Sequence, residues 1–516
     1  TNLITATSKV LVAESPEDGH WILRPQWPQD HGEYWAGTRL QQIPLFLRHT
    51  LPAGASAPID AWVEYATSGE SSPVIRSTLQ IVDFPWVPRP LQRMVVNDMW
   101  MRLNDYRTWP NYVSALRKSG FTGISFFAGD LLDDGGQADR SYDREWVDAR
   151  RAQIVELARE ARETGLGVYL MDTTFNKVGF SRESQWGGLK GSGPLADPTY
   201  RGPIYWDDIA DLTTAYEHLG GADWISIDTE VHKRVTERHF GYFDKAPDAA
   251  ARILAQAKEK GTTVEDIFTD YGTEMIADVR AAIRKSNETL GIANVPPILI
   301  WNFSADEENP MEGLFEFRKL YPDLLPYLYP HVYFMSDSRK IGDRIKKHRR
   351  ILGKSDIIAC VTTSHFSQRD NLRYTELRDQ LLECFFNGAR GIEYWPALND
   401  HNHLYGQLLA LREIRPFEDL LLDGEYIVQT DDAAPTQIAG FIRDNEAVFL
   451  VSDYRLDFDG VIRVRNPFDQ EQAVFHISES RSLGRVGPGE SLDIRLEERR
   501  TAVLYFGDRY TGPEAP

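Results

Sequence analysis

Short apolar runs alternate with amphipathic stretches through the middle of the chain. Eight of the apolar runs have the length of strands: Met94–Asn97, Gly123–Phe127, Gly167–Asp172, Trp224–Glu230, Ile298–Asn302, His331–Ser336, Ile357–Thr362 and Gly391–Trp395. Between them, apolar residues recur with the helical period in stretches such as Ala149–Thr164, Val264–Glu288 and Tyr374–Phe386. Strands that alternate with helices are typical of βα units around a parallel sheet. Eight such units predict an α/β fold, a (β/α)8 TIM barrel.

On both sides of this region the pattern changes to short β-rich runs separated by turn residues. Leu45–Leu47 and Ile75–Val82 are examples before it, and residues 425–506 carry further runs at the spacing of a β-sandwich. The segment Asp83–Pro90 contains three prolines, which block helix and central-strand pairing and indicate a boundary. We therefore expect an N-terminal β-sandwich domain over residues 1–90, a catalytic barrel over 91–415 and a C-terminal β-sandwich domain over 416–516.

Composition and charge exclude several classes of protein. The chain has 516 residues with 42% apolar and 26% charged side chains, as an ordinary globular protein has. Its net charge of −20 repels phosphate backbones and anionic lipids, so we expect no nucleic-acid partner and no membrane partner. No apolar run approaches the roughly 20 residues of a membrane span, which favours a soluble protein. Cys360 and Cys384 lie in apolar surroundings and are expected to be buried free thiols.

The start of the chain leaves its compartment open. It begins at Thr1 without a basic and apolar leader, which fits either a removed export signal or a trimmed chain, so the protein is secreted, periplasmic or cytoplasmic. The oligomeric state is equally open.

The fourth strand carries the most informative polar residues. Alternation along Trp224–Glu230 points Ser226, Asp228 and Glu230 into the barrel, with the Cα atoms of the two acids about 6.6 Å apart. The competing interpretation is that a neighbouring Arg or Lys neutralises an acid at the strand end. Two carboxylates that point inward repel one another, and the repulsion raises the pKa of one of them. Such a pair is seldom kept for stability alone. We therefore favour a catalytic role for both.

Acids and aromatic residues also end the other predicted strands. Two more acids, Asp337 and Glu393, are candidates for catalysis. The candidates for binding substrate are Asp172, Trp100, Trp301, Asn302, Tyr333, Trp395 and His365. Because the active sites of barrel enzymes lie at the carboxyl ends of the strands, these residues are expected to surround one site.

These residue types suit the hydrolysis of glycosidic bonds. That reaction commonly needs one acid to protonate the leaving oxygen and a second carboxylate as nucleophile, base or stabiliser of positive charge. We expect a glycoside hydrolase without cofactor or metal that acts on a neutral or weakly charged oligo- or polysaccharide. Glu230 is the expected general acid/base. Asp228 is its partner or the nucleophile, and Asp337 or Glu393 completes the pair.

The segment Asp223-x-x-Ser226-x-Asp228-x-Glu230 resembles the D-G-x-D-x-D-x-E motif of family 18 chitinase-like enzymes. The resemblance implies that Glu230 is the proton donor and that Asp228 steadies an acetamido group of the substrate. Trp224 and Ser226 depart from that motif. Residues 387–395 are similar to the last barrel strand of several glycoside hydrolase families. A resemblance to clan D glycosidases implies instead an Asp228 nucleophile and an Asp337 acid.

Two alternatives belong to other classes. Asp172, Glu230 and the run Asp306-Glu307-Glu308 occupy roughly the positions of the Mg²⁺ ligands in enolase-like lyases and epimerases. The predicted second strand offers no lysine base for that chemistry, and the flanking domains are expected to be all-β. A barrel that binds carbohydrate without catalysis is the other alternative. The pair His401 and His403 has no matching ligand triplet and is expected to be solvated rather than metal-bound.

Overall fold

The computed structural model describes residues 2–5, 11–14, 22–25, 45–48, 55–61, 71–80, 91–100, 112–132, 144–172, 201, 203–228, 247–301, 317–332, 338–362, 372, 374–395, 401–431, 434–454, 461–496 and 500–510. The chain separates into two compact units, Thr1–Trp86 and Val87–Pro516. The predicted further boundary near residue 415 stays a prediction.

The described part of the first unit consists of antiparallel strand pairs. Strand β1 (Asn2–Thr5) pairs with β4 (Leu45–Arg48), β2 (Leu11–Glu14) with β3 (Ile22–Pro25), and β5 (Ser56–Ala61) with β6 (Ile75–Gln80). The sequence pattern predicts β structure here, but the expected runs include neither β1 nor β3.

The second unit begins with a parallel sheet whose strands occur close to the predicted positions. They are β7 (Val95–Trp100), β8 (Gly123–Phe127), β9 (Gly167–Asp172), β10 (Trp224–Asp228), β11 (Ile298–Trp301), β12 (Ile358–Val361) and β13 (Gly391–Tyr394). Their order in the sheet is β11-β10-β9-β8-β7-β13-β12. The first and last chain segments of the barrel are therefore neighbours, because β13 pairs with β7. This order is that of a (β/α)8 barrel.

The sixth barrel segment starts earlier in the chain than predicted. Leu328 and His331 form parallel bridges to Ile357 and Cys360 beside β12. The prediction of a strand over His331–Ser336 therefore begins about three residues too late, and residues 333–336 lie outside the described residues. Inside the barrel, apolar side chains from β9, β10, β11, β12 and this segment form one buried cluster, composed of Tyr169, Met171, Trp224, Leu299, Tyr329, Ile358 and Cys360.

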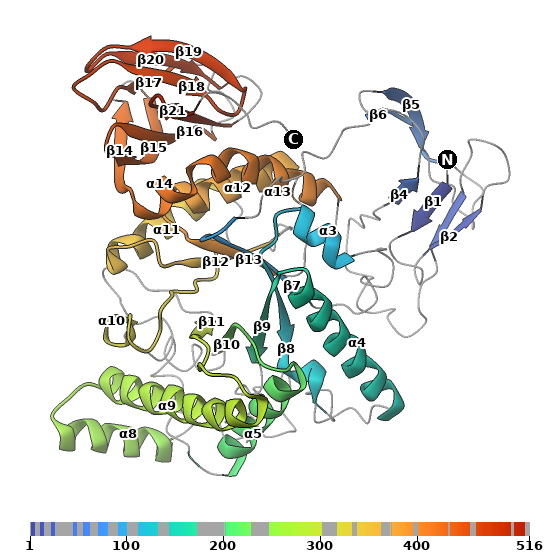
Figure 1. Ribbon diagram of the computed structural model, residues 1–516, viewed down its shortest axis with the longest axis vertical. Helices are drawn as coiled ribbons and strands as arrows, with labels where there is room; N and C mark the ends of the chain where they lie inside the picture. The colour runs from blue at the N-terminus through green and yellow to red at the C-terminus, as the bar shows by residue number, and fades with distance from the viewer. Residues whose placement is uncertain are drawn as a thin grey trace. The chain divides into compact units, whose positions relative to one another are not determined.

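Helices lie around the outside of the parallel sheet (Figure 1). They are α3 (Tyr112–Lys118), α4 (Arg144–Glu163), α5 (Pro203–His218), α8 (Pro247–Lys260), α9 (Val264–Leu290), α10 (Phe317–Leu320), α11 (Ser338–Leu352), α12 (Tyr374–Phe386), α13 (His401–Ile414) and α14 (Glu418–Asp423), with short 3-10 turns at Ala128–Leu131 and Arg415–Phe417. Thr263 and Asp266 form a capping box at the start of α9, which explains why this long helix begins where the pattern predicts.

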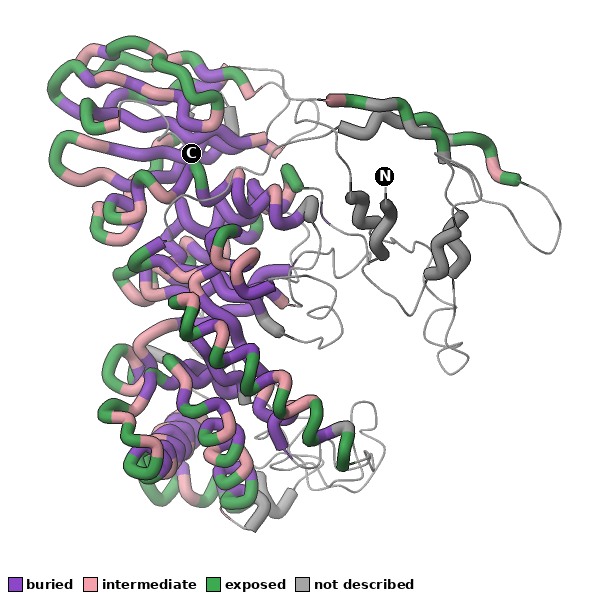
Figure 2. The backbone as a smooth tube through the Cα atoms, turned by 45° about the vertical axis from the view of Figure 1, so that its right-hand side comes forward, coloured by how far each residue is buried: buried purple, intermediate pink, exposed green. Residues whose placement is uncertain are grey.

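The C-terminal region is a β-sandwich. Its strands are β14 (Glu425–Asp431), β15 (Ala434–Arg443), β16 (Glu446–Ser452), β17 (Val461–Arg465), β18 (Gln472–His476), β19 (Arg481–Val486), β20 (Ser491–Arg495) and β21 (Thr501–Phe506). Six of them form one antiparallel sheet in the order β14-β15-β16-β21-β18-β19, and β17 pairs with β20. Ile462 and Ile494 of the small sheet share a buried core with Phe449 and Leu504 of the large one. Figure 2 shows this buried interior beneath exposed strand edges.

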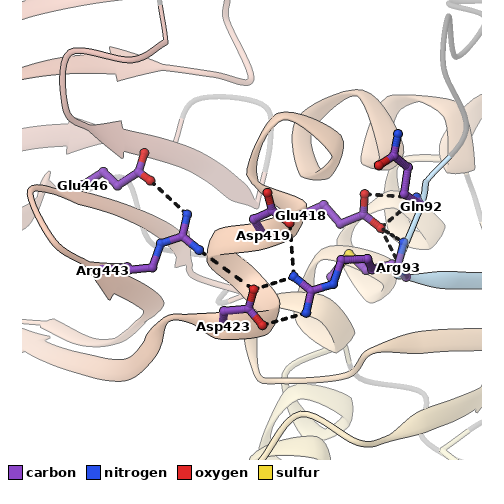
Figure 3. A network of polar contacts seen from close by, with 8 residues as sticks. Gln92, Arg93, Glu418, Asp419, Asp423, Arg443 and Glu446 are labelled. Atoms are coloured by element: carbon purple, nitrogen blue, oxygen red, sulfur yellow. Dashed lines mark hydrogen bonds and ion pairs between the residues drawn. The ribbon is translucent and has the colours of Figure 1, made fainter.

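Polar contacts join the barrel to the C-terminal region (Figure 3). The Glu418 carboxylate of α14 accepts hydrogen bonds from the backbone N–H groups of Gln92, Arg93 and Met94, with distances of 3.0, 2.6 and 2.6 Å to one oxygen. The Arg93 guanidinium also donates to Asp423 at 2.7 Å, and it holds the pKa of that carboxyl below its usual range. The entry into β7 is therefore tied to the helix that precedes the sandwich.

Candidate active site

The carboxyl ends of the barrel strands carry the residues that the sequence singles out. Trp100, Asp172, Asp228 and Trp301 are the last residues of β7, β9, β10 and β11. Asp228 is in register with Trp301, and its neighbour Ile227 is in register with Asp172. The backbone thus brings these predicted positions to one edge of the sheet, while their side chains lie outside the described part of the structure.

Other predicted residues cannot be placed. Glu230, Asp337, Asn302, Tyr333 and His365 lie outside the described residues. Of the predicted catalytic and binding side chains, the structure describes those of Glu393 and Trp395.

Glu393 lies inside the barrel and has no exposed surface. It is in register with Cys360 on β12 and with Asn97 on β7, so the three residues occupy one level of neighbouring strands. Burial raises the pKa of Glu393 to about 7, and the negative charge of Asp98 adds to the increase. A carboxyl group with this pKa is largely protonated below pH 7, where an ordinary glutamate is ionised.

Three polar side chains surround the Glu393 carboxyl group. Ser125 of β8, Tyr329 of the sixth segment and Asn97 lie within hydrogen-bonding range and oppose the rise in its pKa. Among the described residues, neither carboxyl oxygen of Glu393 makes a hydrogen bond of regular geometry, and neither does Asn97 Nδ2 or Ser125 Oγ. We call Asn97, Ser125, Tyr329 and Glu393 the barrel cluster. Buried polar groups are usually satisfied by protein or water, so this cluster suits an ordered water molecule or a polar group of a ligand.

Aromatic residues fill the barrel interior beside the barrel cluster, where Tyr169 is in register with Ser125. The ring of Tyr169 stacks on Trp224 with 3.7 Å between centroids and an interplanar angle of 17°. Gly123 and Gly167 leave room for Tyr169, because a Cβ atom at either position would lie within 2.4 Å of its side chain. Burial raises the pKa of Tyr169, and the charges of Asp223 and Glu393 add to this effect. The stacked rings therefore fill part of the barrel interior.

Trp395 follows β13 and is half-buried. Its indole makes an edge contact with Phe127 at the end of β8, with 5.9 Å between ring centroids. The indole thus packs against the barrel and keeps part of its surface exposed, which suits a contact with a sugar ring.

Ser125 and Tyr329 were not among the residues expected to form the site. Ser125 is the one polar residue of Gly-Ile-Ser-Phe-Phe, and a polar residue within an apolar strand is a signal that can be read. Tyr329 lies before the predicted sixth strand, so its place in the barrel was not expected.

Asp98 is buried on the other face of β7, where it accepts a hydrogen bond from Tyr112 at 2.8 Å. That contact ties β7 to α3.

Other expectations concern metals, thiols and membranes. In the described part of the chain, His, Cys, Asp and Glu side chains form no cluster that suits a metal ion. His403 is buried, and its Nε2 lies 3.0 Å from the carbonyl oxygen of Leu372, so the expectation that it is solvated is wrong. Cys360 and Cys384 are buried free thiols, as predicted. No helix in the described ranges is both long and apolar enough to cross a membrane.

Comparisons with known proteins give likenesses of structure only. No protein-family model matches the sequence, and no curated protein matches it. Solved structures that are similar include an α-amylase from Anoxybacillus, at a TM-score of 0.49 and 11% identity, covering 82% of this chain and 99% of that one. A putative α-N-acetylgalactosaminidase from Bacillus halodurans has a TM-score of 0.48 at 12% identity, covering 82% and 99%. A family GH30 endoxylanase from Clostridium papyrosolvens has a TM-score of 0.43 at 10% identity, covering 82% and 98%. Because all three scores lie below 0.5, the proposal of function rests on the residues of this chain.

Proposed function

We propose that this chain is a glycoside hydrolase whose active site lies at the carboxyl end of the barrel. The observation that carries the proposal is the barrel cluster, in which the buried Glu393 carboxyl has a pKa of about 7 inside the barrel. Barrel interiors are normally filled by apolar side chains, so a buried acid among neutral donors costs stability and is more easily explained by function. A buried carboxyl that keeps its proton can donate a hydrogen bond and hold the polar groups of a site in place, which suits the acid/base chemistry of glycosidases.

The proposed roles follow from exposure and from position on the strands. Glu230 is the general acid/base, and Asp228 is its partner or the nucleophile. Because Glu393 has no exposed surface, we favour Asp337 over Glu393 as the acid that completes the pair. Glu393 then acts as a positioning residue that holds a proton and orders polar groups below the reacting bond.

The substrate is proposed to be an oligo- or polysaccharide. The half-buried indole of Trp395 offers an apolar face to a sugar ring, and Trp100, Trp301, Asn302, Tyr333, His365 and Asp172 are proposed to contact the same chain of sugars. The finer resemblance to family 18 chitinase-like enzymes implies an N-acetylated sugar, since the acetamido group would then take part in the reaction. The resemblance to clan D implies an Asp228 nucleophile instead.

The test is a screen for hydrolysis followed by substitution of the proposed acid. The protein should release reducing sugar from at least one aryl glycoside or natural glycan, without added metal and in the presence of EDTA. Glu230→Gln keeps the shape of the side chain but removes its acidic proton, so turnover should fall by roughly 10² to 10⁴. Glu259→Gln, at an exposed position on α8, is the matched control and should leave turnover unchanged.

Two results would contradict the proposal. Unchanged turnover in a folded Glu230→Gln protein would remove Glu230 from the reaction. Activity that requires Mg²⁺ and a carboxylate substrate would instead favour the enolase-like alternative, and binding of glycans without any turnover would favour a carbohydrate-binding barrel.

A further inference from the structure

Helix α11 carries a concentration of positive charge that contrasts with the rest of the molecule. Residues 338–354 contain eight Lys or Arg residues and one acid, Asp343, in a chain whose net charge is −20. Asp343 forms an ion pair with Lys346 at 3.1 Å. The helix lies on the outside of the barrel next to α12 (Figure 1). A positive surface of this kind raises the local concentration of anions even on an acidic protein.

Three exposed lysines, Lys340, Lys347 and Lys354, recur every seven residues. Seven residues are about two helical turns, so Lys340 and Lys347 lie on the same face of α11, about 10.5 Å apart along its axis. Lys354 follows the end of the helix, after Gly353 in the left-handed conformation at a φ of 66°. We call these three residues the lysine row.

We propose that the lysine row binds an anionic polysaccharide that carries about one carboxylate or sulfate per disaccharide. The spacing of about 10.5 Å between Lys340 and Lys347 is close to the length of one disaccharide in an extended chain, so these two lysines can meet successive charges. Arg339 and Arg350 of α11 are exposed as well and add positive charge along the same helix.

A lipid surface fits the row less well. Ile341 and Ile345, on the opposite side of α11, are buried against the barrel. A helix that lies on a membrane places its apolar residues in the lipid, and here those residues are already occupied by packing. The attraction that remains is between the lysine charges and the charges of the ligand. A single flexible polymer can place its charges along one helix.

The choice of a polysaccharide as the ligand rests on the proposed function. An anionic polysaccharide differs from the neutral or weakly charged substrate that the net charge of the whole chain favours. The row would hold the polymer away from the reacting bond and raise the local concentration of substrate. It is an accessory binding surface rather than part of the catalytic machinery.

The test compares two triple variants of the full chain. Lys340→Gln, Lys347→Gln and Lys354→Gln together remove the row. Lys118→Gln, Lys258→Gln and Lys285→Gln remove the same charge from exposed positions on α3, α8 and α9, which makes them the matched control. The probe is fluorescent hyaluronan, which has one carboxylate per disaccharide, with neutral dextran, single-stranded oligothymidylate and phosphatidylserine vesicles as competitors.

The row variant should bind hyaluronan at least about ten-fold more weakly than the wild type, and the control variant within about two-fold of it, because three charge contacts are lost in one case only. Added salt should weaken wild-type binding. Equal losses in both variants, or preferential binding of oligothymidylate or vesicles, would overturn the proposal. Turnover of a small neutral aryl glycoside should be the same in all three proteins. If no glycoside is hydrolysed at all, the proposed function fails, while the binding comparison still reports on the lysine row.

Discussion

Two buried carboxyl groups, Glu383 and Glu393, have a similar pKa but different surroundings. Burial raises both values to about 7 from an ordinary 4.5. Glu383 of α12 accepts hydrogen bonds from Tyr454 at 2.9 Å and from Asn387 Nδ2 at 2.8 Å, so its oxygens are occupied. Glu393 has donors nearby but no regular hydrogen bond among the described residues. Glu383 is therefore part of the structural framework, and Glu393 keeps the role in the site that we propose for it.

The raised pKa of Glu383 predicts how stability depends on pH. The folded state binds this proton more tightly than the unfolded state, so stability should fall as the pH rises from about 4.5 to about 7 and then stay level. Glu383→Gln imitates the protonated acid and removes this loss. Relative to the wild type, the variant should gain up to about 3 kcal/mol in free energy of unfolding between pH 5 and pH 8.

Urea unfolding of both proteins at the two pH values measures the difference. The exposed Glu259→Gln variant on α8 serves as the control and should show no such gain. A difference between Glu383→Gln and the wild type that does not change with pH would contradict the assignment.

At the scale of elements, glycines allow β8 and β9 to approach the aromatic rings inside the barrel. A Cβ atom at Gly123 would lie 2.0 Å from the Tyr169 ring, which is already stacked on Trp224 and cannot move away without losing that contact. Gly342 has a similar role on α11, where a Cβ atom would lie 2.2 Å from Glu383 Oε2.

Gly123→Ala should therefore destabilise the protein by about 1–3 kcal/mol through overpacking. Removal of the ring by Tyr169→Leu costs stability on its own, but it should cancel much of the penalty of Gly123→Ala in the double variant. Urea unfolding of the two single variants and the double variant gives the coupling energy. Simple additivity would show that the ring is not what restricts position 123.

Other elements show where local pattern is sufficient and where it fails. Helix α12 occurs at the predicted residues, because its apolar period and the Asn387-Gly388 stop are local signals. Strand β19 has no apolar alternation in its sequence, and five of its six residues are exposed or half-buried. It lies at the edge of the large sheet, where pairing with β18 alone decides its structure.

At the scale of the whole molecule, one arginine connects the barrel to the sandwich. Arg378 of α12 is buried and donates to both oxygens of Glu413 at 2.8 Å, to Asp379 at 2.7 Å and to Thr501 of β21 at 2.7 Å. Burial raises the pKa of Asp379 to about 6 even beside this cation. We call Arg378, Asp379, Glu413 and Thr501 the ion group. Its hydrogen bonds are complete only when the barrel and the sandwich pack together.

Arg378→Met should lower the free energy of unfolding by about 3–5 kcal/mol, because Glu413 and Asp379 would remain buried without a cation. Adding Glu413→Gln and Asp379→Asn should restore much of the loss, since a neutral group of similar volume replaces the ions. Thermal unfolding of the single and triple variants checks this. A triple variant as unstable as Arg378→Met would mean that the arginine acts through packing rather than charge.

The sequence by itself determined the order of elements, the barrel and the flanking β structure, because the period of apolar residues reflects which face of each strand or helix is buried. It also indicated that polar residues end the barrel strands, and the register of Asp228 with Trp301 agrees with that expectation. Tertiary structure alone decided which side chains meet. The barrel cluster joins residues 97, 125, 329 and 393, and the ion group joins residues 378, 413 and 501. These contacts, and the pKa values that depend on them, arise only when distant strands pair and exclude water, so no local pattern of the chain contains them.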